Sequence, residues 1–187
     1  MLEPPERNLM GTDAPMLEQL RQAHTRSPAL MPLGETLGFR VERLEAGWAV
    51  VAMETSDRHA NVLGATHGGV IFALADTAMG LAHLGLLAEG QGGTTVEVKI
   101  NFLRPVWRTK LRAEAKTVYS GSTLSLPECS VYDGEQRLIA RAVATLMRLT
   151  EAAGQGRRTV YRGEPPALSK LDGTTESRRE REWLSRS

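Results

Sequence analysis

The 187-residue chain is poor in the features that mark secreted, membrane and disulfide-bonded proteins. Its single cysteine, Cys129, has no partner for an intrachain disulfide, which fits a reducing compartment. No apolar stretch reaches the roughly 18 residues of a membrane span, because Asp76, Thr77, His83 and several glycines interrupt the longest one, at 70–88. The first ten residues, MLEPPERNLM, contain acids and prolines where a signal peptide needs a basic start and an apolar run. We therefore expect a cytoplasmic protein without a membrane partner.

An excess of charge of one sign is absent too. The net charge is +1, so composition gives no argument for a nucleic-acid partner. The four histidines show no metal-ligand spacing and lack a cysteine pair, so no metal site is predicted. The serine motif G-x-S-x-G is absent, and EGQGG at 89–93 is more typical of a helix terminator than of a phosphate loop. Cys129 has no sequence-adjacent base, which indicates a small strand residue rather than a nucleophile.

Hydrophobic periodicity predicts one long helix between two groups of strands. A short amphipathic helix is expected at 16–24, and the long helix runs from about 66 to 88, where the glycines at 89–93 follow it. Strands are expected at 36–45, 48–56, 95–103, 109–119, 123–132 and 137–149. Ala46-Gly47 and Asp133-Gly134 are the expected turns. This order predicts an α+β domain in which an antiparallel sheet packs on a single helix.

The strand at 95–103 has the clearest pattern. Its residues alternate strictly, so one face should carry the apolar side chains Val96, Val98, Ile100 and Phe102, and the other should carry Glu97, Lys99 and Asn101. Composition changes after this region of strands, at about Thr150. We divide the chain into an N-terminal extension with the short helix (1–27), the main domain (28–150) and a polar, flexible tail (151–187).

One carboxylate stands inside the otherwise apolar long helix. At 100 degrees per residue, Asp76 lies roughly opposite the broad apolar side that would pack on the sheet, and it shares its own side with Gly69, Phe72, Gly80 and His83. A side of small residues allows another backbone to approach. A buried carboxylate is costly unless it has partners or a function, so Asp76 is exposed, satisfied by a nearby donor, or catalytic.

The residues that open this helix supply a second chemical group. His67 precedes Gly68 and Gly69, whose N–H groups should point out of the helix N-terminus, where they can polarise a carbonyl and hold an oxyanion. The helix rises about 12 Å from Gly68 to Asp76. One carbonyl therefore cannot be gripped at Gly68 and attacked beside Asp76 of the same chain. Two antiparallel helices in a two-fold dimer would bring the two groups together.

A combined pattern extends over residues 28–149. It consists of Asn61, His67-Gly68-Gly69, Leu74-Ala75-Asp76-Thr77-Ala78 and Thr95-x-Glu97-x-x-Ile100-Asn101-Phe102-Leu103-x-Pro105. This pattern resembles the hotdog-fold acyl-CoA thioesterases, especially the phenylacetate-degradation type. The resemblance implies an antiparallel sheet wrapped around one long central helix. It also implies an acyl-CoA substrate and a homodimer that often pairs into a homotetramer.

The resemblance implies a role for each matching residue. Asp76 corresponds to the general base or nucleophile, Gly68 to the backbone donor to the thioester carbonyl, and Asn61 to the side chain that orients water or substrate. His67 corresponds to a neighbour of the thioester sulfur, and Thr95 to a hydroxyl that helps to hold the water. The expected substrate contacts are Gly69, Phe72 and Thr77. The residues themselves leave simpler roles open, since Asn61 suits an Asx-turn and His67 suits a helix cap.

A thioester is already activated, so one base and one set of oxyanion donors suffice without a metal or an organic cofactor. The CoA phosphates need surface cations, for which the candidates are Arg104, Arg108, Lys110, Arg112, Arg137 and Arg141. Two other functions stay open. One is a non-catalytic acyl-CoA-binding module, against which the presence of Asp76, Asn61 and Gly68 argues. The other is a hydratase or dehydratase, which would use a histidine paired with a carboxylate on the helix.

Overall fold

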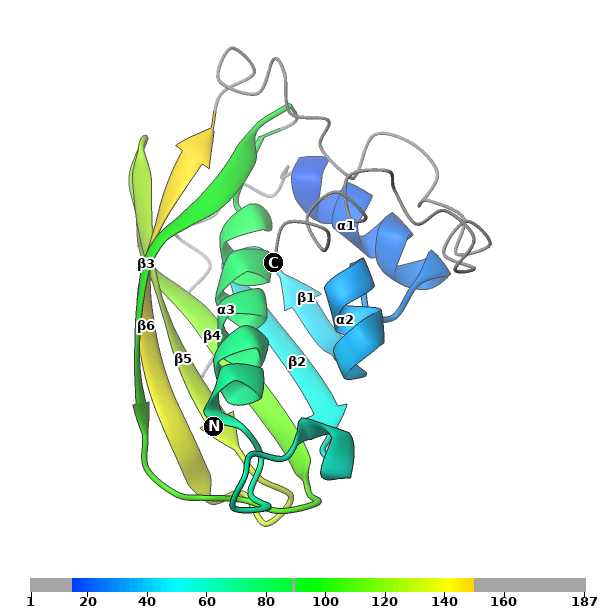
Figure 1. The fold of residues 1–187 in the computed structure, drawn as a ribbon. Coiled ribbons are helices and arrows are strands. Elements are labelled where there is room, and N and C mark those ends of the chain that lie inside the picture. Colours follow the sequence, from blue (N-terminus) through cyan, green and yellow to red (C-terminus); the bar gives the residue numbers. More distant parts are fainter. Residues whose placement is uncertain (1–14, 89, 150–187) are drawn as a thin grey trace, which may run out of the picture. The chain divides into compact units, whose positions relative to one another are not determined.

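Six strands form one antiparallel sheet in the computed structural model, which describes residues 15–88 and 90–149. The order across the sheet is β1-β2-β4-β5-β6-β3, so β3 lies at an edge and pairs only with β6 (Figure 1). The strands are β1 (Arg40–Glu45), β2 (Trp48–Glu54), β3 (Gly92–Phe102), β4 (Lys110–Ser120), β5 (Leu124–Tyr132) and β6 (Leu138–Leu149). The prediction of an antiparallel sheet packed on a single long helix is confirmed.

The long helix α3 (Gly68–Leu84) lies against one face of this sheet, and the strands curve around it (Figure 1). Its sheet-facing side is apolar except for His83, and Leu74, Ala75 and Ala78 have no exposed surface. Burial of one such leucine contributes about 1.5–3 kcal/mol. The helix ends four residues before the predicted end, at Leu84. It stops where it meets the end of β1, since a Cβ on Gly85 would lie 2.9 Å from the carbonyl oxygen of Glu45.

Two helices precede the sheet and lie beside β1 (Figure 1). The first, α1 (Pro15–Arg26), confirms the predicted amphipathic helix and buries Met16 and Leu20. The second, α2 (Pro32–Leu37), was not predicted. It occupies the start of the strand expected at 36–45, and Gly38 ends it in the left-handed conformation with φ 79°. The strand consequently begins at Arg40.

The strict alternation predicted for β3 is wrong at one residue. Thr95 pairs with Leu146 and Glu97 pairs with Thr145, so Val96 is an extra residue, a β-bulge, and its side chain is 58% exposed. The bulge reverses the facing of the strand. Residues 98, 100 and 102 face α3 as predicted, but before the bulge it is residues 93 and 95 that face the helix.

Among the described residues, no helix is long and apolar enough to cross a membrane. The predicted tail at 151–187 and the start of the predicted N-terminal extension, residues 1–14, lie outside the described residues. The division of the chain into three parts stays a prediction.

Candidate active site

Asp76 lies half-buried on the side of α3 that faces β3. The Thr95 hydroxyl donates a hydrogen bond of 3.0 Å to Oδ1 of Asp76. The bulge at Val96 makes this contact possible, because regular alternation would direct Thr95 to the outer face of the sheet. The carboxylate is thus held in place by a neutral donor and stays within reach of solvent, an arrangement that suits a base acting on water.

A second group of residues surrounds the N-terminus of α3. His67 is the residue before the helix, and its Nδ1 accepts a hydrogen bond of 2.9 Å from the N–H of Gly69. The expectation that both glycine N–H groups are free is therefore wrong for Gly69, whose N–H is used by this cap. The N–H of Gly68 has no acceptor among the described residues. Because Nδ1 of His67 is an acceptor, the neutral ring carries its proton on Nε2, and this exposed side chain can donate it.

Asn61 stands in the tight loop before the helix. Its Oδ1 accepts a hydrogen bond of 2.8 Å from the N–H of Leu63, which is the Asx-turn that the sequence left open as an alternative. The backbone fixes this loop further, since the N–H of Asn61 donates to Ala65 and the N–H of His67 donates to His59, each at 2.7 Å. The side-chain oxygen of Asn61 thus shapes the loop, and its amide NH₂ is the group that could meet a substrate.

Phe102 is a member of this second group that sequence reasoning missed. A Cβ placed on Gly68 would lie 3.3 Å from Cζ of Phe102, so the ring packs directly against the glycine. Phe102 is 52% exposed, so its ring lies at the surface beside Gly68. The alternating pattern of the strand predicted which face carries Phe102. No pattern in the neighbouring sequence indicated that its ring would contact Gly68.

The structure places the predicted residues in two separate half-sites. Asp76 and Thr95 form one, and Asn61, His67 and Gly68 form the other. Gly68 and Asp76 are eight residues apart in one continuous helix, about 12 Å along its axis. The predicted substrate contacts lie along the same helix, with Gly69 exposed, Phe72 36% exposed and Thr77 half-buried.

His83 lies two turns after Asp76 but is fully buried. Its Nδ1 is 2.6 Å from Oγ of Ser125, and its ring packs so tightly on Gly93 that a Cβ there would lie 2.5 Å from Cδ2. Burial, followed by the positive charge of Arg148, lowers the pKa of His83 to about 4. A neutral, enclosed imidazole of this kind is a core residue.

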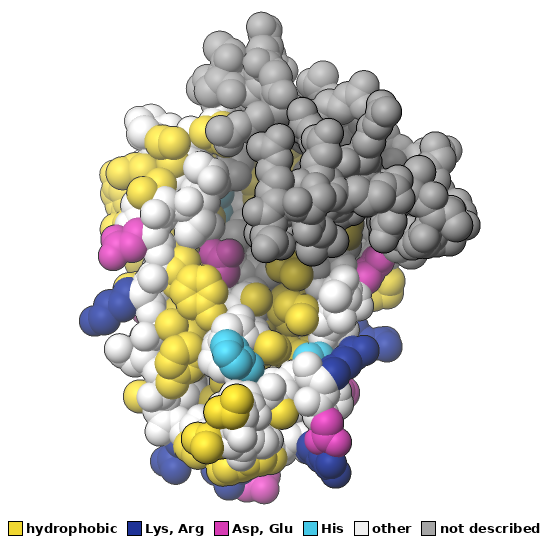
Figure 2. All heavy atoms as spheres, viewed as in Figure 1, with side chains coloured by type: hydrophobic (Ala, Val, Ile, Leu, Met, Phe, Trp, Pro, Cys, Tyr) yellow, Lys and Arg dark blue, Asp and Glu magenta, His cyan; other side chains and the backbone are white. Residues whose placement is uncertain are grey.

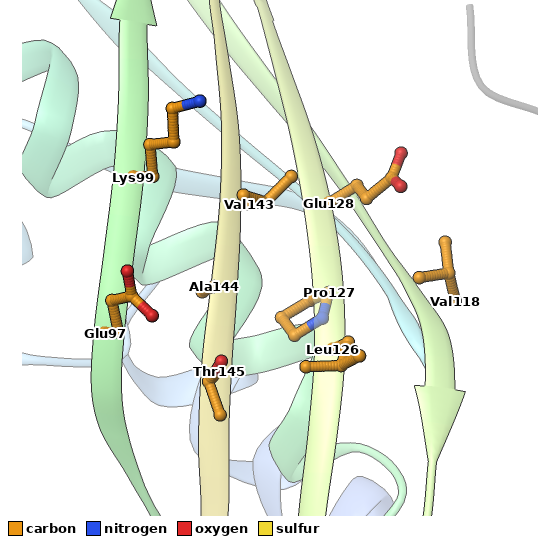
Figure 3. Close-up of a pocket in the computed structure, with 9 residues that line it drawn as sticks. All are labelled: Glu97, Lys99, Val118, Leu126, Pro127, Glu128, Val143, Ala144 and Thr145. Atoms are coloured by element: carbon orange, nitrogen blue, oxygen red, sulfur yellow. The ribbon is translucent and has the colours of Figure 1, made fainter.

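A shallow depression lies on the outer face of the sheet, opposite α3 (Figure 3). Its lining comes from β3, β4, β5 and β6: Glu97, Lys99, Val118, Leu126, Pro127, Glu128, Val143, Ala144 and Thr145. It lies on the opposite face of β3 from the Asp76–Thr95 pair, because Glu97 and Lys99 face away from α3 after the bulge. On the α3 side, hydrophobic side chains gather along β3 and at the end where α3 begins (Figure 2). Within residues 15–88 and 90–149, no group of three or more His, Cys, Asp and Glu side chains could hold a metal ion.

Comparison with known proteins agrees with this fold. Residues 63–140, which include all of α3, β3, β4 and β5, match the model of the thioesterase superfamily. The proofreading thioesterase EntH of Klebsiella pneumoniae is 34% identical over 101 residues, which are 54% of this chain and 74% of that protein.

Two solved structures have the same fold. A thioesterase family protein from Silicibacter pomeroyi superposes with a TM-score of 0.66 at 31% identity, over 72% of this chain and 98% of that chain. A mutant of the phenylacetic acid degradation protein PaaI from Thermus thermophilus superposes with a TM-score of 0.60 at 31% identity, over 64% of this chain and all of that chain. The chain therefore belongs to the thioesterase superfamily, with its hotdog fold, and is a thioester hydrolase.

Proposed function

We propose that this protein hydrolyses an acyl-CoA or aryl-acyl-CoA thioester to the free acid and CoA. The observation that carries the proposal is the Asp76 carboxylate, half-buried in an apolar helix and held at 3.0 Å by the Thr95 hydroxyl. The similarity to a protein of phenylacetic acid degradation supports an aryl-acyl group and a role in phenylacetate degradation.

In the proposed reaction, Asp76 takes a proton from water, whose oxygen attacks the thioester carbon, and this proton later passes to the leaving sulfur. In the alternative route, the Asp76 carboxylate attacks that carbon itself, and water hydrolyses the resulting mixed anhydride after CoA has left, which frees the acid and restores the carboxylate. The Gly68 N–H polarises the carbonyl and stabilises the oxyanion that forms. The C–S bond then breaks, and CoA leaves as the thiol after its sulfur receives a proton. His67 can supply a hydrogen bond to that sulfur, since its exposed Nε2 carries the proton of the neutral ring. The amide NH₂ of Asn61 orients the water or the carbonyl.

The proposed site needs two protomers, because Gly68 and Asp76 of one helix are too far apart to act on one carbonyl. An antiparallel, two-fold pairing of α3 helices would set Gly68 of one protomer beside the partner's Asp76 and would create two equal sites. The edge strand β3 supports such a homodimer. It has one neighbouring strand, and its Val96 and Phe102 side chains are more than half exposed. Val118, Leu126 and Val143 around the outer depression support the pairing of dimers into a homotetramer.

The test is thiol release from a panel of phenylacetyl-, hydroxybenzoyl- and straight-chain acyl-CoAs, with the intact protein compared with Asp76→Ala. We expect turnover to fall by orders of magnitude in the variant while its thermal unfolding stays cooperative. Binding of acyl-CoA without hydrolysis by either protein would instead identify a non-catalytic acyl-CoA-binding module. A monomer with full activity would contradict the shared site.

A further inference from the structure

The connection from β3 to β4, residues 103–109, runs along the end of the sheet where α3 begins (Figure 1). Backbone hydrogen bonds fix it at several points. The N–H of Leu103 donates to Ile139 at 2.8 Å, and Val106 accepts from the N–H of Thr66 at 2.8 Å. The buried Val106 side chain anchors the middle of the connection. This segment is therefore a fixed platform joined to the loop that carries His67.

The ion pairs of the described residues distinguish among the six cations that the sequence offered as candidates for binding the CoA phosphates. Five of the six candidates are neutralised by a carboxylate: Arg108 by Asp57, Lys110 and Arg112 by Glu42, Arg137 by Asp133, and Arg141 by Glu128. The sixth, Arg104, is exposed and has no ion pair or side-chain hydrogen bond within residues 15–88 and 90–149. It stands on the platform two residues after Phe102, the ring that packs on Gly68.

Trp107 lies on the same platform, three residues after Arg104, and is 57% exposed. The residues on either side of Trp107 are each held in place. Val106 is buried before it, and Arg108 after it forms two hydrogen bonds to Asp57, at 2.8 and 2.6 Å. Pro105 favours extended backbone at Arg104, because the residue before a proline is disfavoured in the helical region. The platform thus carries an exposed indole and a guanidinium without an ion pair among the described residues, three positions apart on a backbone that hydrogen bonds hold in place.

We infer that Arg104 and Trp107 bind the nucleotide end of CoA, with the guanidinium on a phosphate group and the indole stacked on the adenine. The inference rests on the proposed function, and it places the nucleotide at the same end of α3 as the Gly68 N–H. A guanidinium pairs with phosphate through parallel N–H donors, and an indole offers a π-face that an adenine can cover. The ordered backbone lowers the entropy cost of binding.

The experiment compares two substrates of the same acid, the CoA thioester and the N-acetylcysteamine thioester, which lacks the nucleotide. Arg104→Ala and Trp107→Ala should raise KM for the CoA thioester about 10- to 100-fold with kcat changed less than about twofold, because each removes one charged or stacking contact. Neither variant should change kcat/KM for the truncated thioester. Trp107→Phe should keep most of the affinity. Arg108→Ala is the matched control, since it removes the same charge from the same segment and should leave KM unchanged.

A second measurement keeps the inference testable without catalysis. Adenosine 3′,5′-bisphosphate is titrated into the full-length protein by calorimetry, and binding should weaken in Arg104→Ala and Trp107→Ala but not in Arg108→Ala. Hydrolysis of both thioesters with equal KM in all variants would overturn the nucleotide site and leave the proposed function standing. If the wild-type protein hydrolyses neither thioester, the proposed function fails. The titration then decides the nucleotide site by itself, and unchanged binding in the variants would overturn it.

Discussion

Removal of the Thr95 hydroxyl is the sharpest test of the Asp76 site. Thr95→Val keeps the shape of the side chain and deletes one hydrogen bond of 3.0 Å to the carboxylate. A hydrogen bond to a charged group contributes about 1.5–3 kcal/mol. Since Asp76 is half-buried and water can replace part of the contact, we take the lower end of that range. We therefore expect kcat/KM to fall about tenfold, because about 1.4 kcal/mol corresponds to a factor of ten.

The assay is a double-mutant cycle of thiol release at saturating and limiting acyl-CoA. Asp76→Asn alone should lower kcat by about 10²- to 10⁴-fold, the usual contribution of a general base. If Thr95 acts through the carboxylate, Thr95→Val should add almost nothing in the Asp76→Asn protein, and Thr95→Ser should keep most of the wild-type rate. Unfolding in urea serves as the control, since loss of this one hydrogen bond should lower the free energy of unfolding by at most about 1.5 kcal/mol and leave the unfolding cooperative. Equal tenfold losses in both backgrounds would refute the reasoning.

The remaining predictions concern packing and protonation. Gly80→Ala should stabilise the folded protomer by about 0.5–1 kcal/mol, because no described atom of the same chain lies within 4 Å of the added Cβ and alanine favours the helix. Gly93→Ala should destabilise the fold by about 1–3 kcal/mol, because the added Cβ would collide with buried His83. The urea midpoints of Gly80→Ala and Gly93→Ala measure both effects. A shift of both midpoints in the same direction would contradict this packing. His83 is protonated below about pH 6.5 in the unfolded chain, but its pKa in the folded protein is lowered to about 4. The free energy of unfolding should therefore fall by up to about 3 kcal/mol as the pH drops from about 6.5 to about 4. Urea titrations at about pH 7 and about pH 4.5 measure this loss, which should be smaller in His83→Gln. Burial raises the pKa of the Cys129 thiol, so it should react with a disulfide reagent only as fast as the protein unfolds, and Cys129→Ala should retain full thioesterase activity; rapid labelling of the native protein would argue against its burial.

Much of the fold could be predicted because apolar residues recur along each helix and strand with the period of that element. The apolar stripe of α3 and the alternating strands are local patterns, and a charge such as Asp76 within an apolar helix is visible in the sequence itself. The His67-Gly68-Gly69 opening was also visible, and the sequence left open that His67 caps the helix, as it does. Only the folded geometry shows that the imidazole of His67 accepts a hydrogen bond from the Gly69 N–H, while the Gly68 N–H has no acceptor among the described residues.

What the sequence could not supply depends on contacts between distant residues. Arg108 pairs with Asp57, 51 residues away, and Arg112 pairs with Glu42, 70 residues away, so the cations could not be sorted from their neighbours in the chain. The end of α3 was placed too late for the same reason, since Gly85 meets a carbonyl oxygen of β1. The six-residue α2 is too short to show a helical period.

Because Val96 is an extra residue in β3, the side chains that face α3 have odd numbers before it and even numbers after it. Odd-numbered residues face α3 before it, where Gly93 meets His83 and Thr95 meets Asp76, and even-numbered residues face α3 after it, where they pack against the core and against Gly68. The hydroxyl that holds the carboxylate therefore depends on the number of residues in the strand as much as on the identity of any one of them. Loss of a single codon at this position would exchange the two faces of the first half of the strand at once and would turn Thr95 outward, even though no residue that touches Asp76 had been replaced.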